Sequence, residues 1–410
     1  MTGVNLFRVP SSMTPLFPEK DGELRELAAE LIKTSAKLTS AFNPVTRLAI
    51  AQLIEPMNSY YSNLIEGHFT HPLDIEKALK KDYSGEPKKK ILQLESRAHV
   101  IVNHHMKKKL RTINNPYTWE FISWLHKSFY DNMPIELRTI KSKDGSDFLL
   151  MPGNKRTTEV EVGKHIAPAA DSLDGFIRFF ENGYKKENNS DSLSRIIAIA
   201  ASHHRLAWIH PFADGNGRVV RLFSEAASIT EKIDGDGLWS ISRGLAVNNN
   251  DYYAALNNAD MKRWNDYDGH GNLSDKFLTE FCLFFLRSAI DQTTFMLSLL
   301  EPDKMTSRLK EFVDIMSTRG EMRKESFYLL EETLFKGKVS KGEMERITGK
   351  SENVARSIMK NLLDKELLVN ESSELRAPVL INFPIKYAPY IFPKLFPKDV
   401  EATMTDYPAY

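Results

Sequence analysis

The stretch His210–Arg221, HPFADGNGRVVR, places a histidine, an aspartate, two glycines and two arginines within twelve residues. Its centre, Gly215-Asn216-Gly217, lets the backbone turn tightly and approach a ligand closely, because glycine adopts positive φ at little cost. Apolar residues recur at helical spacing over Arg218–Thr230, so we expect the loop to lead into a helix. A helix N-terminus offers unpaired N–H groups and a partial positive charge. The stretch therefore predicts an anion-binding loop at the start of a helix.

The side chains of this loop suit the handling of phosphate groups. The imidazole of His210 can accept a proton from an attacking hydroxyl. Asp214 suits Mg²⁺, which binds one or two carboxylates together with phosphate oxygens and water. Arg218 and Arg221 lie three residues apart and share a helix face, and the rigid guanidinium fork fits phosphate oxygens. Asn216 can donate its amide to phosphate. A plain surface loop would explain any one of these residues, but the complete set indicates phosphate chemistry.

Two other kinds of site are weaker interpretations. A transition-metal site is disfavoured because the spacing of the candidate ligands matches none of the common zinc patterns; these ligands are His203, His204, His210 and Asp214. Gly349-Lys350-Ser351 has the form of a P-loop end, but Met344 stands where the first glycine is required. We interpret that match as coincidence.

Composition restricts the class of protein. The 410 residues include 55 basic and 54 acidic side chains, so no overall field favours nucleic acid or an anionic membrane. Cys282 is the only cysteine and lies in an apolar run, which predicts a buried thiol and excludes an intrachain disulfide. The N-terminus lacks a secretory pattern, and no apolar run reaches the roughly 18 residues of a spanning helix. We expect a soluble, cytoplasmic protein of two or three domains with no membrane partner.

Periodicity predicts a mainly α-helical chain. Before the motif we expect helices at 22–41, about 45–67, 75–81, 89–111 and 117–132, with Asp74 as the N-cap of the third. Residues 138–169 alternate polar and β-branched side chains around glycines, which predicts a hairpin. Helical patterns dominate again from 170 to 300.

The C-terminal part has a different organisation. Helical segments at 309–320, 326–337, 340–349 and 351–370 include a short helix, a glycine-containing turn and a longer amphipathic helix, which resembles a helix-turn-helix inside a winged-helix domain. Residues 301–370 hold 14 basic and 13 acidic side chains, fewer net positive charges than a strong DNA binder needs. The expected recognition helix offers only Arg356, Lys360 and Lys365. Both DNA binding and protein docking remain open for this part, and we expect the proline-rich segment 375–397 to pack back onto the protein.

The sequence from His210 to Arg221 resembles the Fic family, because it matches the signature HPFx(D/E)GNGRxxR at every specified position. The resemblance extends to His203, seven residues before the signature, and to 151–168, which is similar to the family's flap hairpin. Tyr252–Leu256 is similar to the YYxxL segment of the adenine pocket. Asp260 departs from the asparagine that the family often carries there.

The resemblance implies a Fic-type helical core that transfers AMP from ATP to a Ser, Thr or Tyr hydroxyl of a protein. His210 would then deprotonate the hydroxyl, and Asp214 would hold Mg²⁺. ATP contacts are implied for Gly215, Asn216, Gly217, Arg218, Arg221, Tyr253 and Asp260. The flap would bind the backbone of the target protein as an added strand, through Arg156, Thr157, Thr158, Glu159, Val160, Glu161 and Val162.

A second signature lies upstream. Ser62–Gly67, SNLIEG, resembles the (S/T)xxxE(G/N) inhibitory motif of many Fic proteins, with Ser62, Glu66 and Gly67 at its specified positions. Glu66 would pair with Arg221 where the γ-phosphate should bind, so ATP would bind non-productively. Some members also remove AMP from a modified protein, with this glutamate orienting water, and family members often dimerise, so a homodimer is an expected partner.

We therefore expect three parts: an N-terminal helical region at 1–115 with the inhibitory helix at about 45–67, a Fic catalytic core with a β-hairpin flap at 116–300, and a winged-helix-like domain and tail at 301–410. The expected function is an autoinhibited protein adenylyltransferase that uses ATP and Mg²⁺. The alternative is a DNA-binding transcriptional or toxin–antitoxin-like regulator whose Fic core senses ATP and whose residues 301–370 bind DNA.

Overall fold

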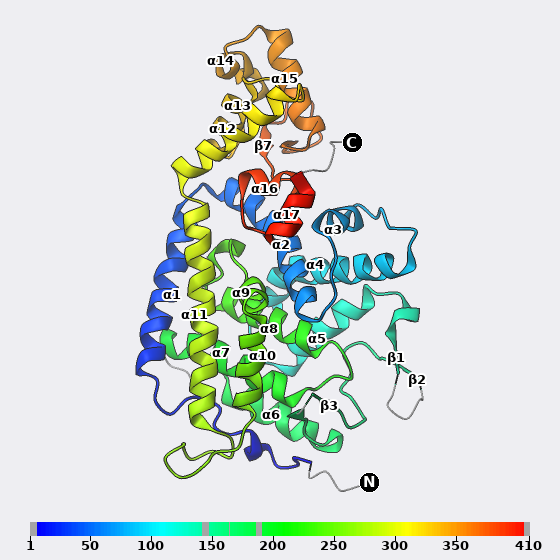
Figure 1. Cartoon of the computed structure of the whole chain (residues 1–410), viewed down its shortest axis with the longest axis vertical. Coiled ribbons are helices and arrows are strands. Elements are labelled where there is room, and N and C mark those ends of the chain that lie inside the picture. Colours follow the sequence, from blue (N-terminus) through cyan, green and yellow to red (C-terminus); the bar gives the residue numbers. More distant parts are fainter. Residues whose placement is uncertain (1–5, 142–146, 164, 186–190, 406–410) are drawn as a thin grey trace.

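The computed structural model describes residues 6–141, 147–163, 165–185 and 191–405, and the predicted mainly α-helical class is confirmed (Figure 1). The helices are α1 Gly22–Ser40, α2 Pro44–Ile65, α3 Pro72–Leu79, α4 Pro87–Ile113, α5 Trp119–Asp131, α6 Leu173–Gly183, α7 Ser192–Ile209, α8 Asn216–Thr230, α9 Ile241–Val247, α10 Asn249–Ala259, α11 Asp275–Leu299, α12 Pro302–Thr318, α13 Ser326–Lys336, α14 Met344–Thr348, α15 Glu352–Asp364, α16 Ala388–Ile391 and α17 Lys398–Thr405. The strands are β1 Thr139–Lys141, β2 Asp147–Leu149, β3 Glu161–Val162, β4 His165–Ile166, β5 Lys338–Val339, β6 Leu368–Asn370 and β7 Val379–Ile381.

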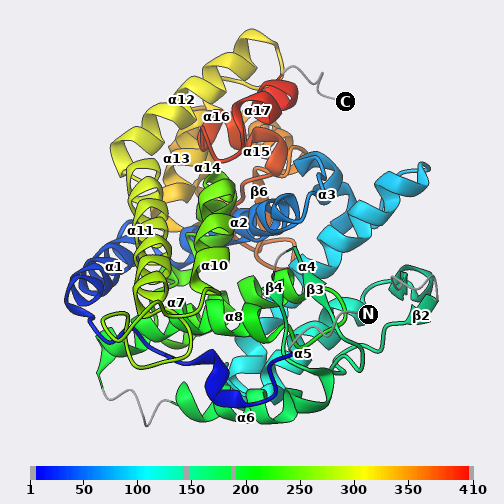
Figure 2. The same ribbon diagram turned by 60° about the horizontal axis from the view of Figure 1, so that its bottom comes forward.

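Helices α7 and α8 pack against each other at the centre of the molecule (Figures 1 and 2). Helix α7 also contacts α1 and α11, and its residues 196–206 are buried in succession. A helix that is buried on nearly every side belongs to the core of a large domain. The loop between α7 and α8 carries the start of the central motif, so two packed helices of the core position it.

Helix α2 begins at a strong start signal. The Asn43 side chain accepts hydrogen bonds from the N–H groups of Val45 and Thr46, and Pro44 occupies the first helical turn. The helix packs against α4 and α9, and it ends at Ile65 because Gly67 adopts a left-handed backbone with φ +78°. The helix thus ends two residues before the predicted end at 67, and Glu66 lies directly after its last turn.

Two local predictions are wrong in detail. Helix α3 begins at Pro72, and its N-cap is His71, whose Nδ1 accepts from the Leu73 N–H at 3.3 Å, whereas Asp74 lies inside the first turn. The single hairpin predicted over 138–169 is instead two separate antiparallel pairs, β1 with β2 and β3 with β4. The chain between β2 and β3 turns inward at the buried Arg156, which interrupts the strand pattern. The predicted hairpin also includes residues 142–146 and 164, which lie outside the described residues.

In the C-terminal part, three helices pack beside a small sheet. Helices α13, α14 and α15 are accompanied by three antiparallel strands in the order β5-β7-β6, at the top of Figure 1. The tail then returns to the main body, where the Tyr61 hydroxyl donates to the Leu395 carbonyl at 3.0 Å and Arg243 donates to the Lys394 carbonyl at 2.7 Å. The segment thus packs back on the protein as predicted.

The buried Cys282 thiol also agrees with the prediction from its apolar surroundings. Within the described ranges, none of the helices is both long and apolar enough to cross a membrane.

Candidate active site

The motif begins directly after α7, where its C-cap residue His210 has a left-handed backbone with φ +48°. This conformation is costly for a residue that is not glycine, and a following proline favours an extended backbone instead. The Arg156 side chain, which is completely buried, holds the backbone in place. Its Nε donates to the His210 carbonyl at 2.8 Å, and its Nη2 donates to the Pro168 carbonyl at 2.5 Å. The Arg156 N–H also donates to the Pro211 carbonyl at 2.9 Å.

This placement changes the expected role of Arg156. The Arg156 guanidinium donates its hydrogen bonds to carbonyls within the protein and is not available to a target protein. Arg156 therefore positions the His210 loop instead. The neighbouring flap residues Thr157, Thr158, Glu159 and Glu161 are exposed, and Val160 is half-buried. Only Glu161 and Val162 of the predicted flap lie in a strand.

His210 is placed to act as a base. Burial lowers its pKa to about 4, and the nearby His165 and Arg156 act in the same direction. The imidazole is therefore neutral near pH 7. A neutral imidazole is the form that accepts a proton.

Asn216 closes the loop from inside. Its Oδ1 accepts from the Phe212 N–H at 2.9 Å, and its Nδ2 donates to the Phe212 carbonyl at 2.8 Å. The Phe212 ring is buried and stacks on His126, with ring centroids 4.0 Å apart. The amide that the sequence assigned to phosphate is therefore bound to the loop backbone, because this pairing fixes the turn before α8.

The Asp214 carboxylate is held by α5. The Tyr130 hydroxyl donates to Asp214 Oδ2 at 2.5 Å, and His126 Nε2 lies 3.2 Å from the Asp214 carbonyl oxygen. Since His126 Nδ1 accepts from the Gly153 N–H at 2.8 Å, its Nε2 carries the proton and donates. Burial opposes ionisation of Asp214, but the Tyr130 hydrogen bond and the charge of Arg218 outweigh it, so the Asp214 pKa is lowered. The carboxylate is ionised and oriented.

The start of α8 is open to an anion. Gly215 is its N-cap, with φ +76°, and no side chain caps this end. The glycine is required there, because a Cβ would lie 2.9 Å from the Tyr130 ring. Arg218 is buried close by, and its Nε has no hydrogen-bond partner among the described residues. An uncapped helix end and an unpaired buried guanidinium nitrogen fit a phosphate group.

Arg218 also contacts residues outside the motif. Its Nη2 lies 3.7 Å from Glu95 Oε1 on α4 and 3.2 Å from His68 Nδ1. His68 Nδ1 is 2.6 Å from Glu95 Oε2, and the hydrogen bond to this carboxylate raises the His68 pKa. Nδ1 therefore donates to Glu95, and Glu95 is the anionic partner of Arg218 in this cluster.

Arg221 is bound by the end of α2. Its Nη2 lies 2.6 Å from Glu66 Oε1 and donates to the Ser62 carbonyl at 2.9 Å, and its Nε donates to the Ser62 hydroxyl at 2.9 Å. The predicted Glu66–Arg221 pairing is thus present. Burial disfavours the charged form of Glu66, but Arg221 outweighs this effect, so the Glu66 pKa is lowered. A Cβ at position 217 would collide with the Glu66 carboxylate, so Gly217 permits its approach.

The metal prediction depends on a single carboxylate. Among the described residues, no group of three or more histidine, cysteine, aspartate or glutamate side chains could hold a metal ion. One ionised carboxylate beside an anion site still fits Mg²⁺, which takes its other ligands from phosphate and water.

Two predicted ATP contacts are engaged elsewhere. The Tyr253 hydroxyl donates to the Ile65 carbonyl at 3.0 Å, so this half-exposed residue contacts the end of α2. Asp260 Oδ2 lies 3.0 Å from His165 Nδ1, and Oδ1 lies 3.1 Å from His204 Nε2. The structure therefore places the Asp260 carboxylate between two histidines rather than with the residues around Arg221.

Comparisons with known proteins agree with the geometry. Residues 116–227 match the model of the Fic/DOC family. The protein adenylyltransferase Fic of Nematostella vectensis is 30% identical over 172 residues, which cover 41% of this chain and 36% of that protein. The protein adenylyltransferase Fic of Drosophila grimshawi is 41% identical over 70 residues, which cover 17% of this chain and 14% of that protein. The findings support a Fic-family protein.

The fold comparison extends further along the chain. The crystal structure of a Fic family protein from Desulfovibrio desulfuricans G20 superimposes with a TM-score of 0.51 at 16% identity, and it covers 92% of this chain and 99% of that one. This likeness shows the fold. The chain itself spans about a third of the Nematostella relative and a smaller share of the Drosophila one.

The sequence alone does not reveal several residues of this site. His126 and Tyr130 belong to the amphipathic helix α5, and the sequence pattern predicts only that they face the core. His68 and Glu95 lie upstream of the matched region 116–227. No spacing relates any of them to the motif, and only the fold brings them to it.

Proposed function

We propose that the chain is an autoinhibited protein adenylyltransferase that transfers AMP from ATP to a Ser, Thr or Tyr hydroxyl of a target protein and of itself. The observation that carries the proposal is the Glu66–Arg221 ion pair beside a complete HPFADGNGRVVR motif. The names of the relatives support AMP transfer for the part of the chain that they cover.

The proposed reaction needs a base and a held triphosphate. The target hydroxyl oxygen attacks the α-phosphorus of ATP, and its proton passes to the neutral imidazole of His210. The bond between the α-phosphorus and the bridging oxygen breaks, AMP becomes esterified to the target, and pyrophosphate leaves. Asp214 is the residue that would hold Mg²⁺, and this ion would neutralise charge on the phosphates. Positioning and electrostatics account for most of the acceleration in such transfers.

The arginines and the helix start would hold the phosphates. The N–H groups at the start of α8 and Arg218 are the expected contacts of the inner phosphates. Arg221 is the expected contact of the γ-phosphate, and Glu66 occupies its guanidinium. The γ-phosphate of ATP bound beside this ion pair would lie next to the Glu66 carboxylate instead of a free guanidinium. AMP transfer would therefore be suppressed. Removal of AMP from a modified target, with Glu66 orienting water, is the second direction that this arrangement allows.

The flap is the proposed docking element for the target. The exposed residues Thr157 to Glu159 and the strand β3 lie next to the His210 loop, which Arg156 joins to this segment. A target backbone that added beside β3 would bring a side-chain hydroxyl toward His210.

We propose that residues 301–410 form a winged-helix module used for protein contacts. The chain order α13, β5, α14, α15, β6, β7 supports this assignment. Seven of the 14 basic side chains of residues 301–370 form ion pairs with described residues, among them Arg356 with Glu352, Lys365 with Glu321 at 3.2 Å, and Arg346 with Glu332 at 3.3 Å. Cations that are already neutralised release few counterions from DNA. The pairing therefore favours protein contacts over the DNA-binding alternative.

Mass spectrometry tests the proposed function. A lysate is treated with the Glu66→Gly protein, ATP and Mg²⁺, and peptides are searched for the mass of an AMP group on Ser, Thr or Tyr. We expect AMP-modified peptides. They should be absent when the Glu66→Gly protein also carries the substitution His210→Ala. The proposal is overturned if a folded Glu66→Gly protein adds no AMP, or adds a phosphate group alone.

A further inference from the structure

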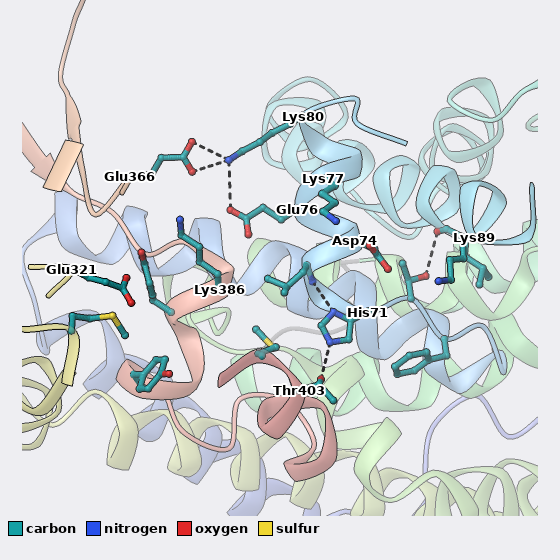
Figure 3. A pocket seen from close by; sticks show the side chains of 18 of the residues that line it. His71, Asp74, Glu76, Lys77, Lys80, Lys89, Glu321, Glu366, Lys386 and Thr403 are labelled. Carbon is teal, nitrogen blue, oxygen red and sulfur yellow. Dashed lines mark hydrogen bonds and ion pairs between the residues drawn. The ribbon is translucent and has the colours of Figure 1, made fainter. Parts of the chain in front are cut away.

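A cavity of about 770 Å³ lies apart from the Fic motif (Figure 3). It is bounded by the segment that follows Gly67, by α3 and the start of α4, and by the C-terminal part, which contributes the end of α12, the short helix Ile385–Tyr387 and α17. None of the residues 210–221 lines it. Its volume is in the range of sites that enclose a small organic molecule.

Part of the cavity wall is apolar. Leu73 of α3 contributes to it together with Met316, Tyr387, Tyr390 and Met404 of the C-terminal part. Met316 and Met404 are buried, so these side chains form a surface that stays shielded from solvent. An apolar wall of this kind favours the hydrocarbon or aromatic body of a ligand.

The unpaired charge around the cavity is mostly positive. Among the described residues, the lining cations Lys77, Arg319 and Lys386 form no ion pair, and only one lining carboxylate, Asp74, is equally unpaired. Of the remaining carboxylates, Glu321 pairs with Lys365, and Glu366 and Glu76 share the single cation Lys80, at 2.7 and 3.7 Å, as Figure 3 shows. The lining thus holds five cations and four carboxylates, and this net charge of +1 fits an anionic group better than a cationic one.

We propose that this cavity binds a small amphipathic anion, a molecule with an aromatic or aliphatic body and one carboxylate, sulfonate or phosphate group, and that its binding alters the segment that carries Glu66. The second half of this statement rests on the proposed function for its effect on activity, whereas the binding itself does not.

A short chain of hydrogen bonds connects the cavity with the end of α2. Thr70 lines the cavity and accepts from the Ser96 hydroxyl at 3.1 Å, and Ser96 accepts from Asn63 Nδ2 at 3.1 Å. The Asn63 carbonyl in turn accepts from the N–H of Glu66 at 3.0 Å. The cavity wall is thus three hydrogen bonds away from the backbone of Glu66.

A further contact joins the two sides of the cavity. His71 Nδ1 accepts the Leu73 N–H, so Nε2 carries the proton and donates to the Thr403 hydroxyl at 3.0 Å, a bond drawn in Figure 3. His71 lies five residues after Glu66, at the start of α3. A ligand that separates α3 from α17 would therefore pull on the exit of the inhibitory segment.

Binding is tested with 8-anilinonaphthalene-1-sulfonate, an aromatic anion, on the full chain. The neutral analogue N-phenyl-1-naphthylamine tests the need for the anion, and inorganic sulfate tests the need for the apolar body. We expect the anion to bind with at least about tenfold higher affinity than either, since a charge-assisted contact is worth about one such factor. Equal affinity for the neutral analogue would overturn the assignment of an anion.

Variants locate the bound probe. The pair Lys77→Glu and Lys386→Glu together should weaken binding of the anion about tenfold or more. Lys88→Glu is the matched control, because Lys88 is exposed, carries the same charge and does not line the cavity. Unchanged binding in the folded double variant would overturn the site.

Coupling is tested by hydrogen exchange over residues 60–71 with and without the probe. We expect exchange in this segment to change in the wild type and to become insensitive to the probe in Ser96→Ala, which still binds it. No change in the wild type at saturating probe would overturn the coupling. If exchange responds but Glu66→Gly never transfers AMP, the proposed function fails while the cavity site stands.

Discussion

The loop 210–217 and the helix face with Arg218 and Arg221 are held by different parts of the chain. The loop is fixed within the region that matches the Fic family, by Arg156, Tyr130 and its own Asn216. The two arginines are bound instead by Glu95 and Glu66, which lie upstream of that region. Under the proposed function, the base and its loop are held in place within the matched region, whereas the expected γ-phosphate contact Arg221 is occupied by Glu66. Activation would then require movement of Glu66 and little rearrangement of the loop.

The largest effect is expected at the base. In a Glu66→Gly background, His210→Ala should lower auto-AMPylation by about two orders of magnitude or more, the usual contribution of a general base. Label from radioactive ATP measures it. His105→Ala, which alters an exposed histidine on α4, should leave the rate unchanged. A His210→Ala variant as active as its parent would show that the loop does not carry the chemistry.

The next effect concerns the positioning of that loop. Arg156→Ala leaves buried carbonyls without a donor, which should cost about 3 kcal/mol in the free energy of unfolding. It should also lower the kcat of the Glu66→Gly protein more than it raises the KM for ATP. Thermal melts and steady-state kinetics measure both, and Arg156→Lys should retain part of the activity. If KM alone changes, Arg156 acts on ATP binding rather than on His210.

A smaller effect is expected at Tyr130. Tyr130→Phe removes the donor that stabilises the ionised Asp214, so the pKa of Asp214 should rise toward its usual value. A group with a lowered pKa is charged above that pKa and loses its charge as the pH falls, so Mg²⁺ binding should weaken at a higher pH in the variant than in its parent. The Mg²⁺ concentration that gives half-maximal auto-AMPylation should therefore rise. An unchanged Mg²⁺ requirement across the acidic pH range would remove Tyr130 from the site.

The smallest effect is expected at Ser62. Ser62→Ala removes one hydrogen bond to Arg221 but leaves the Glu66 ion pair, so auto-AMPylation of the otherwise wild-type chain should rise about two- to fivefold, the worth of one net hydrogen bond. Ser40→Ala, at an exposed serine on α1, is the control. A Ser62→Ala effect as large as that of Glu66→Gly would move the restraint from the carboxylate to the serine.

The sequence predicts local features better than contacts between distant segments. The helix after Gly215 and the pairing of Glu66 with Arg221 follow from motifs with fixed spacing. The bonds from Arg156 and Tyr130 join segments more than fifty residues from the motif, and no pattern marks them. The sequence predicts a phosphate contact for Asn216 and does not reveal its bond to Phe212, because that bond forms only in the folded turn. The hairpin at 138–169 divides because a buried side chain interrupts an alternation that looks continuous in the sequence.

The central claim is that the Glu66 carboxylate holds back an otherwise complete site, and auto-AMPylation by wild type, Glu66→Gln and Glu66→Gly tests it directly. Glu86→Gln, a change of the same kind at an exposed surface glutamate, is the control. All four proteins are incubated with labelled ATP and Mg²⁺ at equal concentration. We predict little label on wild type and Glu86→Gln, more on Glu66→Gln, and the most on Glu66→Gly. Equal label on wild type and Glu66→Gly would contradict the account.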